Sequence, residues 1–272
     1  MKHREELSVL TSAPDHEVPL DHAALVFAQE EYPGLNVRAY LDRLDAMAAE
    51  LAMEIDLEAG PRNALAELSA FLFERQGFRG NEDDYEDPRN SYLNEVLDRR
   101  LGIPISLSVV YIAVARRLGL EVRGVGLPGH FIVKYDTPDG TLFVDPFHGG
   151  RFLTREECFR LAERALGRRV ARSDALLAAA TNRQILTRML YNLKAVYLKR
   201  GDLRKALGIS ELILAIFPWD LDEIRDRGML HHRLRDDAAA RRDLDLYLRY
   251  RSDARDADAV RRTLEAIRSR NA

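Results

Sequence analysis

A histidine and an aspartate, a pair that many enzymes use to move a proton, stand at the two ends of a predicted β-hairpin. His130 opens the run HFIVKYD, Asp145 closes the run TLFVD, and a Thr-Pro-Asp-Gly turn separates them. If Asp136 and Thr141 pair across this turn, His130 lies opposite Phe147 and Asp145 is its diagonal neighbour on the same face. A carboxylate there accepts the imidazole N–H, fixes the tautomer and raises the basicity of the ring. The pair supplies two members of a nucleophile–base–acid triad, or else a hydrogen-bonded core histidine and a strand end.

Hydrogen-bonding side chains are dense in the segment from Asn81 to Asn94, ahead of the hairpin. One interpretation makes this segment a polar wall of a cleft at His130, in which an asparagine donates to a carbonyl oxygen of a ligand. The binding candidates are Asp84, Asn90, Tyr92 and Asn94. The other interpretation is capping of helices by Asp87 and Asn90 within a solvated loop.

Metal binding is a further possibility, because His148 follows the His130/Asp145 pair and all three are ligand types that zinc accepts. Their spacing does not place the three side chains on one face of the hairpin. Histidines just beyond a strand are also often exposed. The sequence therefore predicts no metal site, and it indicates no cofactor.

The elements that must position these residues are helices followed by a small sheet. Helical patterns lie between residues 21 and 33, 37 and 51, 61 and 77, 88 and 102, and 104 and 119, most of them bounded by glycine or proline. From residue 121 the period changes to that of strands, with one strand ahead of the hairpin. After Gly149-Gly150 the chain returns to helix. The pattern predicts an α+β domain over residues 19–178, preceded by a mobile tail over residues 1–18.

An internal repeat with a period of 34 residues occupies the last part of the chain, residues 179–272. The positions that align are Tyr197 with His231, Ala206 with Ala240, and Pro218 with Ser252. The small residues suit a close helix–helix contact, and the segment 199–202 suits the turn between two helices. A helix–turn–helix repeat of this period is the tetratricopeptide signature. We expect two degenerate repeats and a final helix; an ordinary helical bundle is the alternative.

The composition argues against a nucleic-acid-binding, membrane-spanning or secreted protein. Lys and Arg number 41 against 44 Asp and Glu, for a net charge of −3, whereas nucleic-acid binders usually carry a basic excess. No apolar run is long enough to span a membrane, and the N-terminus MKHREELSVL has no signal-peptide core. A single cysteine indicates no disulfide. We expect a cytoplasmic protein without nucleic-acid or membrane partners; the oligomeric state stays open.

Longer motifs resemble a known family. PGHFIVKYD and LFVDPF, after a helix ending RRLGLEVRGV, resemble the transglutaminase-like core, a papain-like α+β fold. GNEDDYEDPRNSYLNEVLDRRLGIPISLS, with PGHF and DPFHGG, is similar to one bacterial subgroup that carries C-terminal tetratricopeptide repeats and is named after a regulator of invasion-gene expression. A related segment occurs in a eukaryotic F-box protein. The resemblance covers about residues 20 to 265.

The resemblance also shows what this chain lacks. In the transglutaminase-like family the nucleophile is a cysteine at a helix N-terminus, and His130 and Asp145 match the general base and its orienting acid. The family's cysteine falls on Pro104 or within a residue of it, and proline has no nucleophilic atom. Cys158, the chain's single cysteine, lies beyond the hairpin and is predicted to be a small buried hydrophobe.

A serine is the remaining candidate nucleophile. Ser108 lies four residues after Pro104, on the same helix face but about 6 Å along the axis, whereas Ser106 points elsewhere. Structural roles are the alternative, with Ser106 as a first-turn cap and Ser108 bonded back to a carbonyl. The sequence thus supports two hypotheses. The first is a non-catalytic binding or regulatory module that recognises a peptide or protein partner through a cleft and the helical repeats. The second is an amidase, peptidase or acyltransferase that uses Ser108, or Ser106, with His130 and Asp145.

Overall fold

The computed structural model describes residues 2–270, which form two compact units. One unit comprises Ala13–Met189, and the other combines the N-terminal segment up to Ser12 with the chain from Leu190 onward. The unit boundary falls inside one long helix, α8 (Asn182–Lys199), rather than at the expected position 178/179. The residues that the sequence analysis proposed for chemistry all lie in the first unit.

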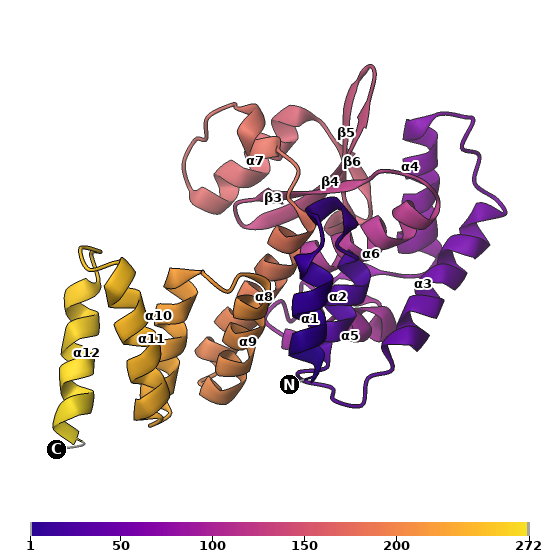
Figure 1. The fold of residues 1–272 in the computed structure, drawn as a ribbon. Helices are drawn as coiled ribbons and strands as arrows, with labels where there is room; N and C mark the ends of the chain where they lie inside the picture. The colour runs from indigo at the N-terminus through magenta and orange to yellow at the C-terminus, as the bar shows by residue number, and fades with distance from the viewer. Residues whose placement is uncertain (1, 271–272) are drawn as a thin grey trace. The chain divides into compact units, whose positions relative to one another are not determined.

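Helices build the first part of the Ala13–Met189 unit (Figure 1). They are α2 (Leu20–Ala28), α3 (Val37–Ala52), α4 (Pro61–Ser69), α5 (Leu93–Arg99) and α6 (Pro104–Arg117). A π-helical turn, Ala70–Arg75, continues α4 toward Gly77, and a 3₁₀ turn, Pro88–Asn90, precedes α5. Asp87 caps that turn by accepting from the Arg89 N–H. The helical segments predicted from the sequence are present, although the segment from 88 to 102 is divided into two pieces.

A four-stranded antiparallel sheet follows, in the order β3-β4-β5-β6. Its strands are β3 (Arg123–Leu127), β4 (His130–Thr137), β5 (Gly140–Asp145) and β6 (Arg151–Leu153). Asp136 pairs with Thr141 across the hairpin turn, which confirms the predicted register. Strand β6 was not predicted from the sequence. A short parallel pair, β1 (Arg79–Gly80) with β2 (Leu101–Gly102), was not predicted either; it joins the two ends of the segment from 81 to 100.

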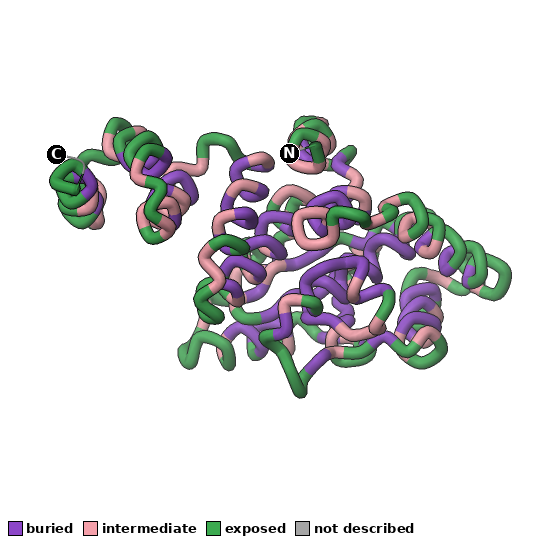
Figure 2. The backbone as a smooth tube through the Cα atoms, turned by 90° about the horizontal axis from the view of Figure 1, so that it is seen from below, coloured by how far each residue is buried: buried purple, intermediate pink, exposed green. Residues whose placement is uncertain are grey.

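The core of this unit forms where helices cover the sheet. Helix α6 packs against β4 and against the 3₁₀ turn Pro146–His148, while α7 (Arg155–Leu166) packs against β3, β4 and β6. Buried side chains from the sheet and α7 form one apolar cluster, which includes Val125, Ile132, Phe143, Cys158 and Phe159. Figure 2 shows that the buried segments lie in the interior of the unit and that exposed loops surround them. The apolar residues of these strands therefore fix the sheet between α6 and α7.

The second unit is entirely helical. Two helix pairs, α8 with α9 (Leu203–Ile216) and α10 (Leu221–Arg233) with α11 (Asp237–Tyr250), are followed by α12 (Ala257–Arg270). Ala206 and Ala240 are buried, as the repeat predicted, and Gly201 adopts φ +75° in the first turn. The buried Lys194 donates to Glu223 at 2.5 Å and to Asp226 at 3.0 Å, which ties α8 to α10. The helical pairs confirm the predicted period.

The N-terminal segment differs from the expected mobile tail. Residues Lys2–Ser12 form helix α1, which packs on α9 within the second unit. Leu7 and Thr11 are buried at a spacing of four residues, so they lie on the same side of this short helix. The polar composition of the segment gave no sign of this buried side. None of the helices described between residues 2 and 270 is long and apolar enough to cross a membrane.

Candidate functional site

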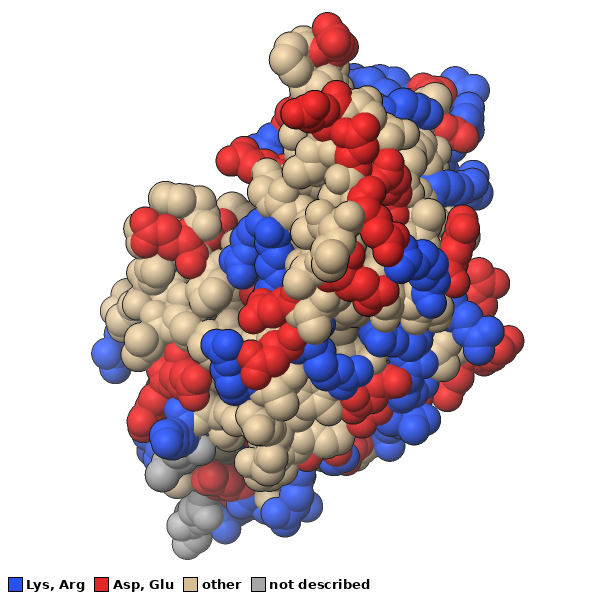
Figure 3. Space-filling model, turned by 90° about the vertical axis from the view of Figure 1, so that its right-hand side faces the viewer, with Lys and Arg blue, Asp and Glu red and all other residues tan. Residues whose placement is uncertain are grey.

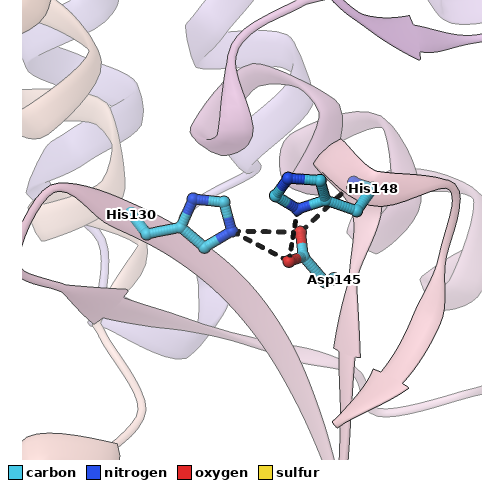
Figure 4. A group of neighbouring side chains, drawn as sticks. All are labelled: His130, Asp145 and His148. Atoms are coloured by element: carbon cyan, nitrogen blue, oxygen red, sulfur yellow. Dashed lines mark hydrogen bonds and ion pairs between the residues drawn. The ribbon is translucent and has the colours of Figure 1, made fainter. Parts of the chain in front are cut away.

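The hairpin brings His130 and Asp145 into direct contact. His130 begins β4, Asp145 ends β5, and the imidazole Nε2 lies 3.0 Å from each carboxylate oxygen (Figure 4). Asp145 is completely buried, and His130 is nearly so. The diagonal contact predicted from the register is therefore present. A carboxylate accepts a hydrogen bond from an imidazole N–H, so this contact favours the tautomer with the proton on Nε2 and the lone pair on Nδ1.

A third side chain joins this pair because the chain curls back after β5. Asp145 caps the 3₁₀ turn Pro146–His148 by accepting from the backbone N–H groups of Phe147 and His148. Gly149 and Gly150 both have positive φ, and the Gly150 N–H donates to the Asp145 carbonyl. The turn directs the His148 ring inward, where its Nδ1 lies 2.8 Å from the Asp145 carboxylate. We call His130, Asp145 and His148 the His130 cluster.

The carboxylate of Asp145 is held in its charged form. Burial alone would raise its pKa, but hydrogen bonds and electrostatic attraction from His130 and His148 outweigh burial, so the pKa lies below its ordinary value. A buried carboxylate with two imidazole donors and two backbone donors has a fixed orientation. The Asp145 carboxylate is therefore a fixed negative charge that orients both rings.

Aromatic rings surround the cluster on one side. The Phe147 ring meets His130 edge-on at 6.1 Å between centroids, and it meets Tyr85 edge-on at the same distance. A Cβ added at Gly80 would come within 2.6 Å of the Phe147 ring, so glycine in β1 makes room for this aromatic side chain. Tyr85 is 47% exposed and the His148 side chain 41% exposed. The site therefore reaches the surface through Tyr85 and His148 rather than through His130.

Arg188 fixes the backbone beneath the cluster. Its guanidinium donates to the carbonyl oxygens of Leu127 at 2.7 Å and His130 at 2.8 Å, and it stacks over the Phe131 ring. These bonds clamp the turn between β3 and β4, where His130 begins. Arg188 was not predicted from the sequence, because it lies in α8, far along the chain from the hairpin.

Cys158 is not available as a nucleophile. It is completely buried in the apolar cluster beneath the sheet, as the sequence predicted. Burial, together with the negative charges of Glu157 and Asp145, raises the pKa of its thiol to about 12. The thiolate, which is the reactive form, is therefore scarce at neutral pH.

We expect native Cys158 to resist alkylation. The folded chain should show no iodoacetamide adduct in intact-mass measurements under conditions that fully modify a free thiol, because burial and the raised pKa both oppose reaction. The urea-unfolded chain provides the control and should gain one adduct. Rapid modification of the folded chain would contradict a structural role for this residue.

The two candidate serines both lie in helix α6, and the hydroxyl group of each is bonded to the backbone. The Ser108 hydroxyl donates to the Pro104 carbonyl at 2.7 Å, and the Ser106 hydroxyl donates to the Asn90 carbonyl at 2.6 Å and accepts from the Ile103 N–H. Both side chains are completely buried. These are the backbone-bonded roles that the sequence analysis offered as the structural alternative. A nucleophilic Ser108 would have to break its bond to Pro104 first.

Two of the candidate binding residues form structural contacts. Asn90 accepts from the Asn81 amide and donates to the Asp84 carbonyl, which closes the loop from 81 to 90. Tyr92 is buried against the rings of Phe27 and Tyr32. Asn90 and Tyr92 therefore face the interior. The segment from 81 to 94 can form only part of the predicted polar wall.

The other two binding candidates, Asp84 and Asn94, have different surroundings. The Asp84 side chain is exposed on the loop that carries Tyr85. Asn94 is buried, and its side-chain oxygen is one of two buried side-chain polar atoms that lack a hydrogen-bond partner among residues 2–270. Recognition of a ligand by Asp84 or Asn94 stays a prediction.

Comparison with known proteins agrees with this architecture. A family model described as the transglutaminase-like superfamily matches residues 38–191, and a tetratricopeptide-repeat model matches residues 193–265. The chain is 39% identical to a UPF0162 protein of Xylella fastidiosa over 93% of this chain and 91% of the relative. It is 28% identical to the UPF0162 protein YchA of Escherichia coli over 81% of each chain. It is also 31% identical to the human F-box only protein 21, over 68% of this chain and 30% of that protein.

The hairpin with His130 and Asp145, the helix α6 and the family match together define a transglutaminase-like domain, which is followed by tetratricopeptide repeats. The chain belongs to the UPF0162 family of this superfamily. The resemblance inferred from the motifs PGHF and DPFHGG is thus confirmed.

The participation of His148 was not predicted from the sequence. Strand alternation alone placed it off the common face, yet the Asp-Pro pair at 145–146 and the two glycines at 149–150 are signals of a tight turn. Such a turn reverses the chain and brings position 148 back to position 145. The prediction that His130, Asp145 and His148 would not converge was therefore wrong.

Proposed function

We propose that this protein is a binding module, in which the transglutaminase-like domain holds a protein partner without forming a covalent bond to it. The observation that carries this proposal is the chemistry of the site. The His130–Asp145 pair is assembled, while Cys158 is buried with a raised pKa and the Ser106 and Ser108 hydroxyls are bonded to backbone carbonyls. A base without an available nucleophile favours recognition over acyl transfer.

The surface of the site supports recognition of a protein. Tyr85, Phe147 and His148 form a set of contacting rings, and two of the three are well exposed. Aromatic side chains are enriched at protein interfaces. On the face of the molecule in Figure 3, acidic and basic side chains are interspersed, without the broad basic field that nucleic-acid binding uses.

The helical repeats offer a second contact surface. A hollow between α8 and α10 is lined by Lys194, Leu198, Asp226, Met229, Leu230 and Arg233. Its floor is apolar, its rim carries both signs of charge, and Leu198 is partly exposed there. Tetratricopeptide repeats commonly take extended peptides in such hollows. We infer that a partner segment binds here, with Arg233 as a charged contact at the rim.

Photo-crosslinking tests this function. A benzophenone amino acid placed at Leu198, at Tyr85, or at the similarly exposed Leu166 as a control would be irradiated in living cells that express the full chain. We expect one protein to be captured from positions 198 and 85 and not from 166. Arg233→Glu should reduce the capture at 198 by about tenfold, since reversal of a contacting charge costs on the order of 1.4 kcal/mol or more.

The matched control is Arg204→Glu, which makes the same charge change on an exposed position of α9 and should leave capture unchanged. Equal capture from all three probe positions, or no capture from 198 and 85, would contradict the proposal. Cleavage or acylation of the captured protein that depends on Ser108 would instead favour the serine-dependent enzyme.

A further inference from the structure

We propose that the His130 cluster is a binding site for a divalent transition-metal ion, best suited to Zn²⁺. The ligands would be His130 Nε2, one carboxylate oxygen of Asp145 and His148 Nδ1. The candidate ligand atoms of these three residues all lie within 4.8 Å of one another. Figure 4 shows both rings directing a nitrogen toward the same carboxylate. His148 belongs both to this site and to the ring set proposed to contact a partner, so titration of the chain alone tests the metal site separately from partner binding.

The spacing of the ligand atoms suits a small ion. Ligands that bind a tetrahedral zinc ion at about 2.0–2.1 Å lie about 3.3 Å from one another. Here His130 Nε2 lies 3.0 Å from the Asp145 oxygens, and His148 Nδ1 lies 2.8 Å from one of them. Binding therefore requires separations that grow by only a few tenths of an ångström. The two nitrogens lie within 4.8 Å of each other, and rotation of the partly exposed His148 ring can adjust their separation to the ion.

His148 is the second histidine bonded to Asp145, and a general base with its orienting acid does not require it. One carboxylate orients one imidazole in such a pair, whereas Asp145 binds two. Two imidazoles and one carboxylate form a three-ligand set with an open fourth position, as in zinc sites that also bind water. Each ring can place its proton on its other nitrogen, so the ion replaces two N–H···O bonds by a change of tautomer.

The surroundings hold the proposed ligands in place. Backbone N–H groups of Phe147 and His148 bind the Asp145 carboxylate, and Arg188 binds the His130 carbonyl. Such supporting bonds orient metal ligands and raise affinity. The half-exposed Arg151 has its Nε 4.0 Å from the carboxylate and opposes an ion by its charge. Its long side chain can move outward when the ion enters.

Calorimetric titration of the untagged, EDTA-treated full chain with ZnCl₂ tests the site. We expect one ion per chain with Kd on the order of 1 µM or tighter, and Co²⁺ should give the visible absorption of a four-coordinate ion. His148→Ala should weaken binding at least about 100-fold, since loss of a supporting residue alone costs up to about that factor. Arg151→Gln, which removes the competing charge, should tighten binding severalfold.

The control variants remove histidines elsewhere. His16→Ala changes an exposed side chain of the same unit, and the double variant His231→Ala/His232→Ala tests the neighbouring pair on α10. Both should bind Zn²⁺ like the wild type. The proposal is overturned if wild-type Kd exceeds about 10 µM, if His148→Ala binds equally well, or if only the double variant loses the ion. Because the His148 side chain is partly exposed, at 41%, its variant should fold, and circular dichroism would verify this.

Discussion

Replacing Gly150 with alanine is expected to destabilise the transglutaminase-like unit by roughly 2–5 kcal/mol. Gly150 has φ +73°, where an L-residue is strained, and its new Cβ would lie 2.5 Å from Ser69 Cβ and 2.7 Å from Phe73. Ser69 is buried and its hydroxyl is bonded to the Leu65 carbonyl, so it has little freedom to move. The strain and the clash add, and the turn that carries His148 would be displaced.

The neighbouring glycine provides a matched control. Gly149 has almost the same conformation, φ +70°, but a Cβ there would meet no atom within 4 Å. Gly149→Ala should therefore cost only the backbone strain, about 1–2 kcal/mol. Urea denaturation followed by circular dichroism would compare the two variants with the wild type. Equal losses of stability at positions 149 and 150 would contradict the close packing of Gly150 on Ser69.

Asp145→Ala is expected to lower the stability by about 2–4 kcal/mol, because it leaves several donors without an acceptor. The buried carboxylate binds both imidazoles and two backbone N–H groups. Asp145→Asn, which keeps the size, should cost nearly as much, since its amide N–H₂ group would face a ring N–H. The exposed Asp139 in the hairpin turn makes a control with the same charge change, and Asp139→Asn should cost less than about 0.5 kcal/mol.

Acidification should reveal the same interaction. The pKa of Asp145 is lowered in the folded protein, so the stability that its charge contributes is present above the unfolded-state pKa of about 3.9 and is lost as the pH falls through the lower folded value. The gap in unfolding free energy between wild type and Asp145→Asn should therefore narrow below about pH 4. Urea titrations in steps from about pH 5 to 3 measure it. A constant gap over this range would mean that the carboxylate charge is not what stabilises the cluster.

Much of the fold could be predicted because local signals agreed with one another. The Thr-Pro-Asp-Gly turn fixed the pairing of Asp136 with Thr141, and that register placed Asp145 diagonally beside His130. The 34-residue period and the buried small residues Ala206 and Ala240 predicted the helical pairs. In each case a short sequence segment determined which residues meet.

The rest of the site depends on contacts between distant segments. Tyr85 meets Phe147 and Arg188 binds the His130 carbonyl, yet neither contact leaves a periodic signal in the sequence. Helix α1 was missed because its buried face consists mainly of Leu7 and Thr11, too few residues to give a clear pattern. Asn90 and Tyr92 have the composition of a binding loop, but tertiary packing turns them toward the core.

The short ladder between β1 and β2 has a consequence for how family members can differ in length. Arg79 and Asn81 donate their N–H groups to the carbonyls of Arg100 and Gly102, so the chain from 81 to 100 is an excursion whose ends are already joined. Residues 82–86 are exposed at its tip. Doubling the length of a closed loop costs only about 0.6 kcal/mol in entropy. Evolution can therefore insert or delete residues at this tip, and reshape the surface beside Tyr85, while the geometry of His130 and Asp145 stays unchanged.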